Sequence, residues 1–119
     1  MEQTTQLFVW GTFVHLVADW VLQNEWMTRY KRDLRHPAGW VHGTIHTVML
    51  LLVFPWAASL FVGLVHVLVD TRKPLEWWLR YYKHLSDGPH RLTVEIWVDQ
   101  VMHLMVIALA AFAVPYFGL

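Results

Sequence analysis

Four long apolar stretches constrain this sequence more than any other feature. Charged segments separate the first from the second and the third from the fourth, and an uncharged turn at residues 54–59 divides the second from the third. The four stretches cover residues 7–27, 39–59, 60–78 and 92–119. Each is close to the roughly 20 residues that a helix needs to cross a bilayer. Charged residues make up only 15% of the chain, below the roughly one quarter that is usual in globular proteins. The sequence therefore predicts an all-α, polytopic membrane protein in which a single domain, residues 1–119, forms an antiparallel four-helix transmembrane bundle.

Basic residues give this predicted bundle an orientation. They gather in the segment 28–38 and again in the segment 72–91. Because Lys and Arg concentrate in cytoplasmic loops, we expect both segments in the cytoplasm and both termini outside. Apolar residues at helical spacing after Lys73 predict a short interfacial helix between the third and fourth spans. The expected location is the bacterial inner (cytoplasmic) membrane, with membrane lipids as partners.

Overall charge and cysteine content narrow the kinds of ligand. The formal net charge is +0 and the chain contains no cysteine. A neutral chain has no basic field for nucleic acid, which is therefore not expected as a partner. Without thiolates, any bound metal must be held by nitrogen and oxygen atoms. A bundle of this size can also associate with itself, so a homo-oligomer remains open.

Each apolar stretch contains one pair of potential metal ligands four positions apart. The pairs are His15 and Asp19, His42 and His46, His66 and Asp70, and Asp99 and His103. Residues four apart lie on the same helical face, so each pair can point toward the bundle axis. Counting helical rise from the expected cytoplasmic boundary puts one member of every pair at a depth of roughly 8–12 Å. The matching depths predict one shared site, with His42 nearer its cytoplasmic mouth.

This donor set favours a divalent metal, with zinc ahead of manganese or iron. The predicted ligands are His15, Asp19, His46, His66, Asp70, Asp99 and His103. They exceed what one zinc ion takes from protein, so either two ions or one ion with supporting hydrogen-bonded residues fits. A metal-free network of His and Asp hydrogen bonds is the structural alternative, although clustered aspartates without a cation repel one another.

The leading functional hypothesis is a metal-dependent hydrolase that acts on an ester or phosphoester near the cytoplasmic leaflet. In this hypothesis Lys73 receives a phosphate or lipid headgroup, Gln23 and Gln100 orient substrate or water, and His42 ligates metal or moves protons. A non-enzymatic protein is the main alternative, either a metal or proton carrier or a phage-encoded module that binds a host membrane partner. Haem held by two histidines is a third, less favoured reading.

The sequence also resembles a family of small phage and bacterial membrane proteins of unknown function, typified by a phiKZ-like phage open reading frame. The resemblance rests on the segment 15–23, on His42 with His46, on the segment 66–70 with Lys73, and on Asp99-Gln100 with His103. It covers nearly the whole chain and implies the same membrane bundle and polar cluster. The family brings no established reaction.

Overall fold

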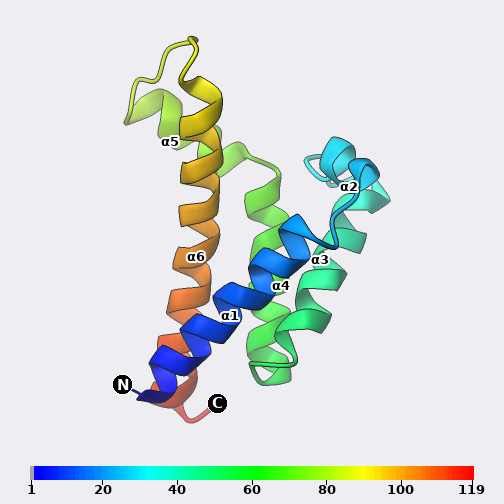
Figure 1. The fold of residues 1–119 in the computed structure, drawn as a ribbon, viewed down its shortest axis with the longest axis vertical. Coiled ribbons are helices and arrows are strands. Elements are labelled where there is room, and N and C mark those ends of the chain that lie inside the picture. The colour runs from blue at the N-terminus through cyan, green and yellow to red at the C-terminus, as the bar shows by residue number, and fades with distance from the viewer. Residues whose placement is uncertain (1) are drawn as a thin grey trace.

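The computed structural model describes residues 2–119 and is built from helices joined by turns (Figure 1). Within these residues the helices are α1 (Glu2–Trp20), α2 (Glu25–Tyr30), α3 (Pro37–Leu50), α4 (Trp56–Asp70), α5 (Lys73–Tyr81) and α6 (Arg91–Phe117). The prediction of an all-α protein is confirmed.

Local residue chemistry fixes where several helices begin and end. The Asn24 side chain accepts a hydrogen bond from the Met27 backbone N–H at 2.9 Å, which caps the start of α2. Pro37 occupies the first turn of α3, where its missing N–H costs nothing. Pro55 separates α3 from α4, and Gly118 closes α6 in the left-handed conformation that glycine adopts without strain. Turn residues therefore end helices at positions where the hydropathy of the sequence stays high.

Four of the helices form a ring around a central space. α1 packs against α3 and α6, and α4 packs against the same two helices. The short helices lie at one end of the molecule, where α2 contacts α3, and α5 contacts α4 and α6 (Figure 1). α1 begins and α6 ends at the opposite end of the molecule. This arrangement brings residues from four helices to one interior.

Apolar side chains fill the half of this interior that is nearer the chain ends. They come from all four ring helices and from the α3–α4 turn: Val14, Leu50, Phe54, Ala58, Val62, Ile107, Ala110, Ala111 and Val114. Burial of such side chains is the main favourable term in folding. The half nearer α2 and α5 holds the polar residues described below.

The predicted four-helix transmembrane bundle is wrong. Within residues 2–119, only α6, with 27 residues, is long and apolar enough to cross a membrane, while α4 is a shorter apolar helix of 15 residues. The apolar stretches of the sequence run through turns that end the helices, so they are longer than the helices they contain. The second stretch is broken at the turn that precedes Pro55. The first forms most of α1, whose 19 residues are long enough to cross a membrane but not apolar enough.

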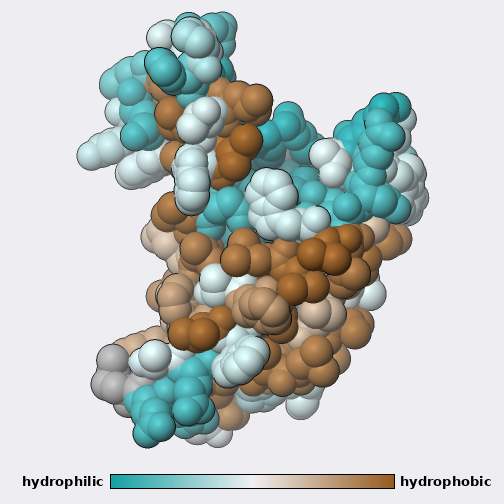
Figure 2. All heavy atoms as spheres, in the orientation of Figure 1, coloured by the Kyte–Doolittle hydropathy of each residue, from teal (hydrophilic) through white to brown (hydrophobic). Residues whose placement is uncertain are grey.

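Large hydrophobic side chains also cover the outside of the helices. Trp10, Phe61 and Leu109 are 58%, 61% and 68% exposed. Figure 2 shows apolar side chains across the middle of one face, with hydrophilic residues gathered toward both ends. Large exposed apolar surfaces mark contact with a partner or with lipid. The location in an inner membrane is a prediction that these observations do not test.

Close contact between α3 and α4 depends on two glycines that face each other. A Cβ atom at Gly43 would overlap the Val67 side chain, and one at Gly63 would overlap the Thr47 side chain. Neither neighbour lies at the end of a long flexible side chain. Glycine at these positions therefore lets the two helices approach closely.

Substitution of Gly63 by Ala tests this packing. Ala normally stabilises a helix interior relative to Gly, but here the added methyl group must displace Thr47. We expect Gly63→Ala to lower the free energy of unfolding by about 1–3 kcal/mol in chemical denaturation. Gly88→Ala is the control, because a Cβ there meets nothing within 4 Å. A Gly63→Ala protein as stable as the wild type would contradict this account of the helix contact.

Candidate metal centre

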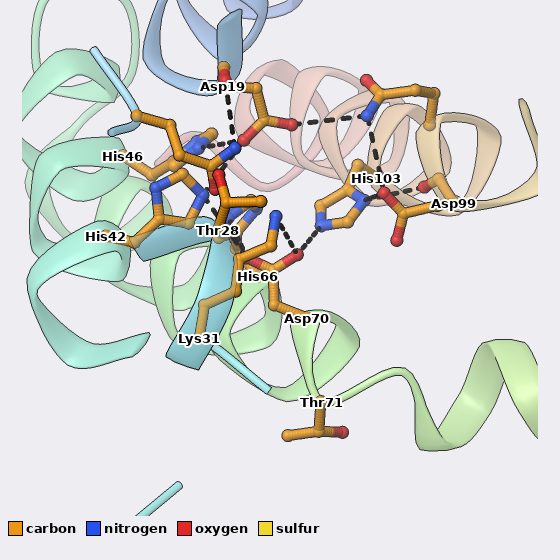
Figure 3. A network of polar contacts seen from close by, with 12 residues as sticks. Asp19, Thr28, Lys31, His42, His46, His66, Asp70, Thr71, Asp99 and His103 are labelled. Carbon is orange, nitrogen blue, oxygen red and sulfur yellow. Dashed lines mark hydrogen bonds and ion pairs between the residues drawn. The ribbon is translucent and has the colours of Figure 1, made fainter. Parts of the chain in front are cut away.

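Asp19, near the end of α1, is the first of two buried carboxylates in the polar half of the interior. Its Oδ1 atom lies 3.0 Å from His42 Nε2 and 2.9 Å from His46 Nε2, both on α3. Its Oδ2 atom lies 3.3 Å from His15 Nε2, one turn earlier on α1. Three imidazoles from two helices thus converge on one carboxylate, and Figure 3 shows two of them, His42 and His46, beside Asp19.

Asp70, at the end of α4, is the second carboxylate and has a similar surrounding. His66 Nε2 lies 2.8 Å and His42 Nε2 lies 3.4 Å from its Oδ2 atom. His103 Nε2 of α6 lies 3.1 Å from Oδ1, and the Lys31 ammonium lies 3.7 Å from the same oxygen. His42 faces both aspartates, so the two groups form one continuous cluster (Figure 3).

Two sets of residues in this cluster could hold a metal ion. The first is Asp19, His42, His46 and His66, and the second is His66, Asp70 and His103. In each set the potential ligand atoms all lie within 4.8 Å of one another. His66 belongs to both. Nitrogen and carboxylate donors in groups of three or four are the ligands that zinc takes in proteins.

Several atoms of the cluster are buried without a hydrogen bond, which supports the fit to a metal. His66 Nε2, His103 Nε2 and Asp70 Oδ2 have no hydrogen-bond partner of acceptable geometry among residues 2–119. They lie close to one another, but their directions do not suit hydrogen bonds. Buried polar atoms left unsatisfied are uncommon and call for an explanation, such as an ion. A cation between them would satisfy all three.

Burial and mutual contact hold most histidines and both aspartates of the cluster in the protonation states in which they can ligate a metal. Burial lowers the pKa of His15 to about 4 and also lowers the pKa values of His46 and His66. Burial alone would raise the pKa values of Asp19 and Asp70, but the surrounding histidines outweigh it and hold both below the usual range. Neutral imidazoles and ionised carboxylates are the forms that ligate metal.

His103 differs from the other histidines. Its Nδ1 atom donates a hydrogen bond to the Asp99 backbone carbonyl at 2.7 Å, which directs Nε2 toward Asp70. Burial lowers the pKa of His103, but Asp70 and then Asp99 outweigh it and raise this pKa to about 9. In the absence of metal, a charged His103 therefore partly balances the two aspartates. A bound metal would take the place of its Nε2 proton.

The structure brings together most of the residues predicted for the site. His15, Asp19, His46, His66, Asp70 and His103 are each at most 7% exposed and lie in the cluster. Asp99 lies at its edge and in neither set, with Oδ2 3.7 Å from His103 Nδ1. A carboxylate beside a histidine in this way orients a ligand more often than it binds the ion.

Of the residues predicted to serve the site without being its main metal ligands, some lie in the site and others lie outside it. The placement of His42 at a shallow mouth is wrong, because it is 0% exposed and contacts both aspartates. Gln100 lies in the site, where its amide contacts His15 and Asp19. Gln23 lines the adjoining cavity and donates to the Asp19 backbone carbonyl. Lys73 is exposed and lines a different surface hollow.

A cavity of about 180 Å³ opens onto the cluster from the end that carries α2 and α5. Asp19 and Asp70 line it together with Lys31, Arg32 and Arg72. Sequence reasoning placed these three basic residues in loops and assigned the anion-binding role to Lys73, with Arg72 only nearby. Lys31 reaches Asp70 because α2 packs against the end of the bundle. The hydropathy of the sequence does not predict this packing.

Fold and site together define an all-helical protein with a buried His/Asp cluster that could hold a metal ion. The sequence model of one family, described as "Protein of unknown function (DUF3307)", matches residues 7–117. The chain therefore belongs to the DUF3307 family. No curated protein and no solved structure matched the chain. The family match does not bear on the resemblance to the phage-type family, which remains an interpretation of the sequence.

Metal content tests the cluster directly. We expect protein purified without added metal to contain one or two equivalents of a divalent metal by elemental analysis. His66→Ala removes the residue common to both sets and should lower metal content below half of the wild-type value. His90→Ala, on an exposed histidine at the start of α6, should change nothing. Equal metal in the His66→Ala and wild-type proteins would contradict the assignment.

The histidine pKa values also predict how stability depends on pH in chelator-treated protein. Below the ordinary pKa of 6.5, the unfolded chain binds protons that folded His15 does not, so stability falls as pH drops toward about 4. Above 6.5, folded His103 keeps a proton that the unfolded chain releases, so stability falls again as pH rises to about 9. The free energy of unfolding should therefore peak near pH 6.5.

Single variants separate the two limbs of this profile. His15→Gln should make the fall in stability at acid pH less steep, with His46 and His66 causing the rest, and His103→Gln should remove the fall at alkaline pH, in chemical denaturation at a series of pH values. A wild-type profile that is level from pH 4 to pH 9 would contradict the buried positions of these histidines.

Proposed function

We propose that this protein is a metal-dependent hydrolase that cleaves an ester or phosphoester at the Asp19/Asp70 cluster. The observation that carries the proposal is the open cavity, which brings solvent and substrate to two sets of potential metal ligands. Ligand-rich sites at the base of a cavity that also holds charged residues are typical of metal-assisted hydrolysis. The metal would be zinc, with manganese or iron as alternatives, and His66 allows two ions to share a ligand residue.

Within residues 2–119, the cavity lined by both aspartates opens at one end of the molecule, which favours an enzyme over a carrier. The cavity reaches the cluster from the α2 and α5 end. Beyond the histidines lies a space of only about 10 Å³, bordered by Leu50, Val62 and Ile107. A space of this size holds at most one water. A carrier needs polar access from both sides, whereas a hydrolase needs only one entrance.

Metal would supply two kinds of chemistry here: polarisation of the scissile ester and activation of water for attack at neutral pH. Asp19, His42, His46 and His66 would hold one ion, and Asp70 with His103 would complete a second position beside it. His103 is directed toward this position by its hydrogen bond to the Asp99 carbonyl. Such support of a ligand by a neighbouring backbone group strengthens metal binding.

Two residues at the cavity wall would serve the reaction without binding metal. Gln100 contacts both His15 and Asp19, so its amide can orient water at the edge of the cluster. Asp99 lines the cavity, and burial raises its pKa, although His103 opposes this shift. A carboxyl group with a raised pKa is suited to give a proton to a leaving group.

A structural His/Asp network is the second candidate, and one observation favours it. His103 and Lys31 both contact Asp70 Oδ1, so cations already lie beside one of the carboxylates without a metal. In that case the cluster would hold the four ring helices together and would have no catalytic role. Chelation would then leave the protein's stability unchanged.

Hydrolysis assays separate these candidates. We expect zinc-loaded protein to hydrolyse at least one of p-nitrophenyl acetate, p-nitrophenyl phosphate and bis(p-nitrophenyl) phosphate. Asp70→Asn should reduce the rate by about 10- to 100-fold or more, because it removes a charged ligand. Asp87→Asn is the control, since Asp87 is fully exposed at its carboxylate. Rates indistinguishable between Asp70→Asn and wild type on all three compounds would refute the hydrolase.

A further inference from the structure

We propose that Lys31 and Arg72 form a phosphate-binding wall of the cavity, so that the substrate is a phosphoester rather than an uncharged ester. This inference rests on the proposed hydrolase and names its substrate class. It assigns to these two residues the role that sequence reasoning gave to Lys73.

Arg72 provides the first observation. Its side chain is 15% exposed and lies 3.4 Å from Glu95, yet its Nε atom is buried with no hydrogen-bond partner among residues 2–119. Arginine offers donors in a planar fork that matches phosphate oxygens. Arg72 lines the cavity, and its contact with Glu95 does not use all of the donors of the guanidinium, so the group has donor capacity left for a ligand.

The backbone conformation of Arg72 is the second observation that supports the phosphate-binding wall. Its φ of 65° is in the left-handed region, which is unfavourable for a residue other than glycine. Such a conformation costs about 1–3 kcal/mol and is found most often at functional sites. Here it lies between α4 and α5, directly after the segment that carries Asp70. The strained turn therefore holds the guanidinium beside the cluster.

The position of Lys31 is the third observation that supports the phosphate-binding wall. Its side chain is 16% exposed, and its ammonium group is 3.7 Å from Asp70 Oδ1, longer than a good hydrogen bond. The group therefore keeps donors for a ligand in the cavity that it lines. Figure 3 shows Lys31 reaching from α2 toward Asp70 at the edge of the histidine cluster.

Charge balance points to the same ligand. Three basic residues and three aspartates line the cavity: Lys31, Arg32, Arg72, Asp19, Asp70 and Asp99. With all three carboxyl groups ionised, the formal charges of these side chains cancel, and a protonated Asp99 adds one further positive charge, so a bound divalent ion leaves a surplus of at least two positive charges. A phosphate group balances this surplus, whereas an uncharged ester does not. The cations would hold the phosphate oxygens while the buried ligands hold the metal.

Two sources of phosphate are compatible with this wall: a soluble phosphoester and a phospholipid headgroup. Trp20 lines the cavity and is 65% exposed, and the neighbouring Val21 is 73% exposed. An apolar rim next to a phosphate-binding wall suits a phosphate that carries an acyl chain. The shared chemistry is the phosphate, and the two sources are distinguished by experiment.

Calorimetric titration of zinc-loaded protein with inorganic phosphate tests the wall. We expect binding that weakens by about 10- to 100-fold in Arg72→Asn and in Lys31→Gln, because each removes a charge-assisted hydrogen bond. Asn tolerates the left-handed conformation, so Arg72→Asn should keep the turn. Arg80→Gln, on an exposed arginine of α5 outside this cavity, is the control. Zinc content is measured in each variant, so that loss of phosphate binding is separated from loss of metal.

Phosphate binding that is absent in the wild type, or equal in wild type, Arg72→Asn and Lys31→Gln at equal zinc content, would overturn the inference. Hydrolysis of p-nitrophenyl acetate alone would then leave the hydrolase in place with a different substrate. Conversely, phosphate binding without hydrolysis of any ester would support the wall and refute the hydrolase.

Glycerol phosphate and a short-chain phosphatidic acid, used below its micelle concentration, distinguish the two sources. Tighter binding of the lipid, weakened by Trp20→Ala, assigns the wall to a lipid phosphate. Equal affinities assign it to a soluble phosphoester. Failure of both to bind would contradict the inference.

Discussion

Two buried carboxylates surrounded by histidines determine how the rest of this structure is arranged. Asp19 and Asp70 lie in the interior of a helix ring, where an isolated negative charge is costly. The ring surrounds them with imidazoles from all four helices, and His42 contacts both. Any change that separated the helices would leave a charge unpaired. The cluster therefore links the packing of the bundle to its chemistry, and a metal ion would strengthen both.

The two ends of the interior have opposite character, and this division places the site. Apolar side chains fill the end near the chain termini, whereas the histidine cluster and its cavity lie near α2 and α5. Basic residues from the segment after α2 and from the α4–α5 turn border the entrance. With a divalent ion bound at the cluster, this entrance would carry a net positive charge and attract an anionic ligand. Exposed apolar side chains such as Trp20 lie beside this opening, as the proposed lipid phosphate would require.

Helical periodicity was enough to predict the cluster, because it is a local property. Pairs spaced by four, such as His15 with Asp19 and His66 with Asp70, share a face once a helix forms, whatever surrounds the helix. The number of membrane spans could not be obtained in this way. Hydropathy continues through the turn before Pro55, so it overstates helix length and led to the four-span prediction that the structure contradicts.

Errors within the site have a related origin in tertiary structure. His42 was placed near a mouth by counting residues along α3, but the loop after α2 covers this end of α3. The Lys31 carbonyl would lie 2.8 Å from a Cβ at Gly39, which shows how closely the loop packs there. The exposed position of Lys73 follows from the left-handed turn at Arg72, which diverts the chain. Neither the loop's position nor this turn has a clear signature in the sequence.

The central claim is that one or two metal ions are held between Asp19 and Asp70. Anomalous X-ray scattering from crystals of the metal-loaded protein, recorded at the absorption edge of the bound metal, tests it most directly. The account predicts a peak at about 2.0–2.1 Å from the Nε2 atoms of His46 and His66, with a second peak near His103 if two ions bind. A map from metal-loaded crystals with no peak in this cluster, or with its main peak elsewhere on the chain, would contradict it.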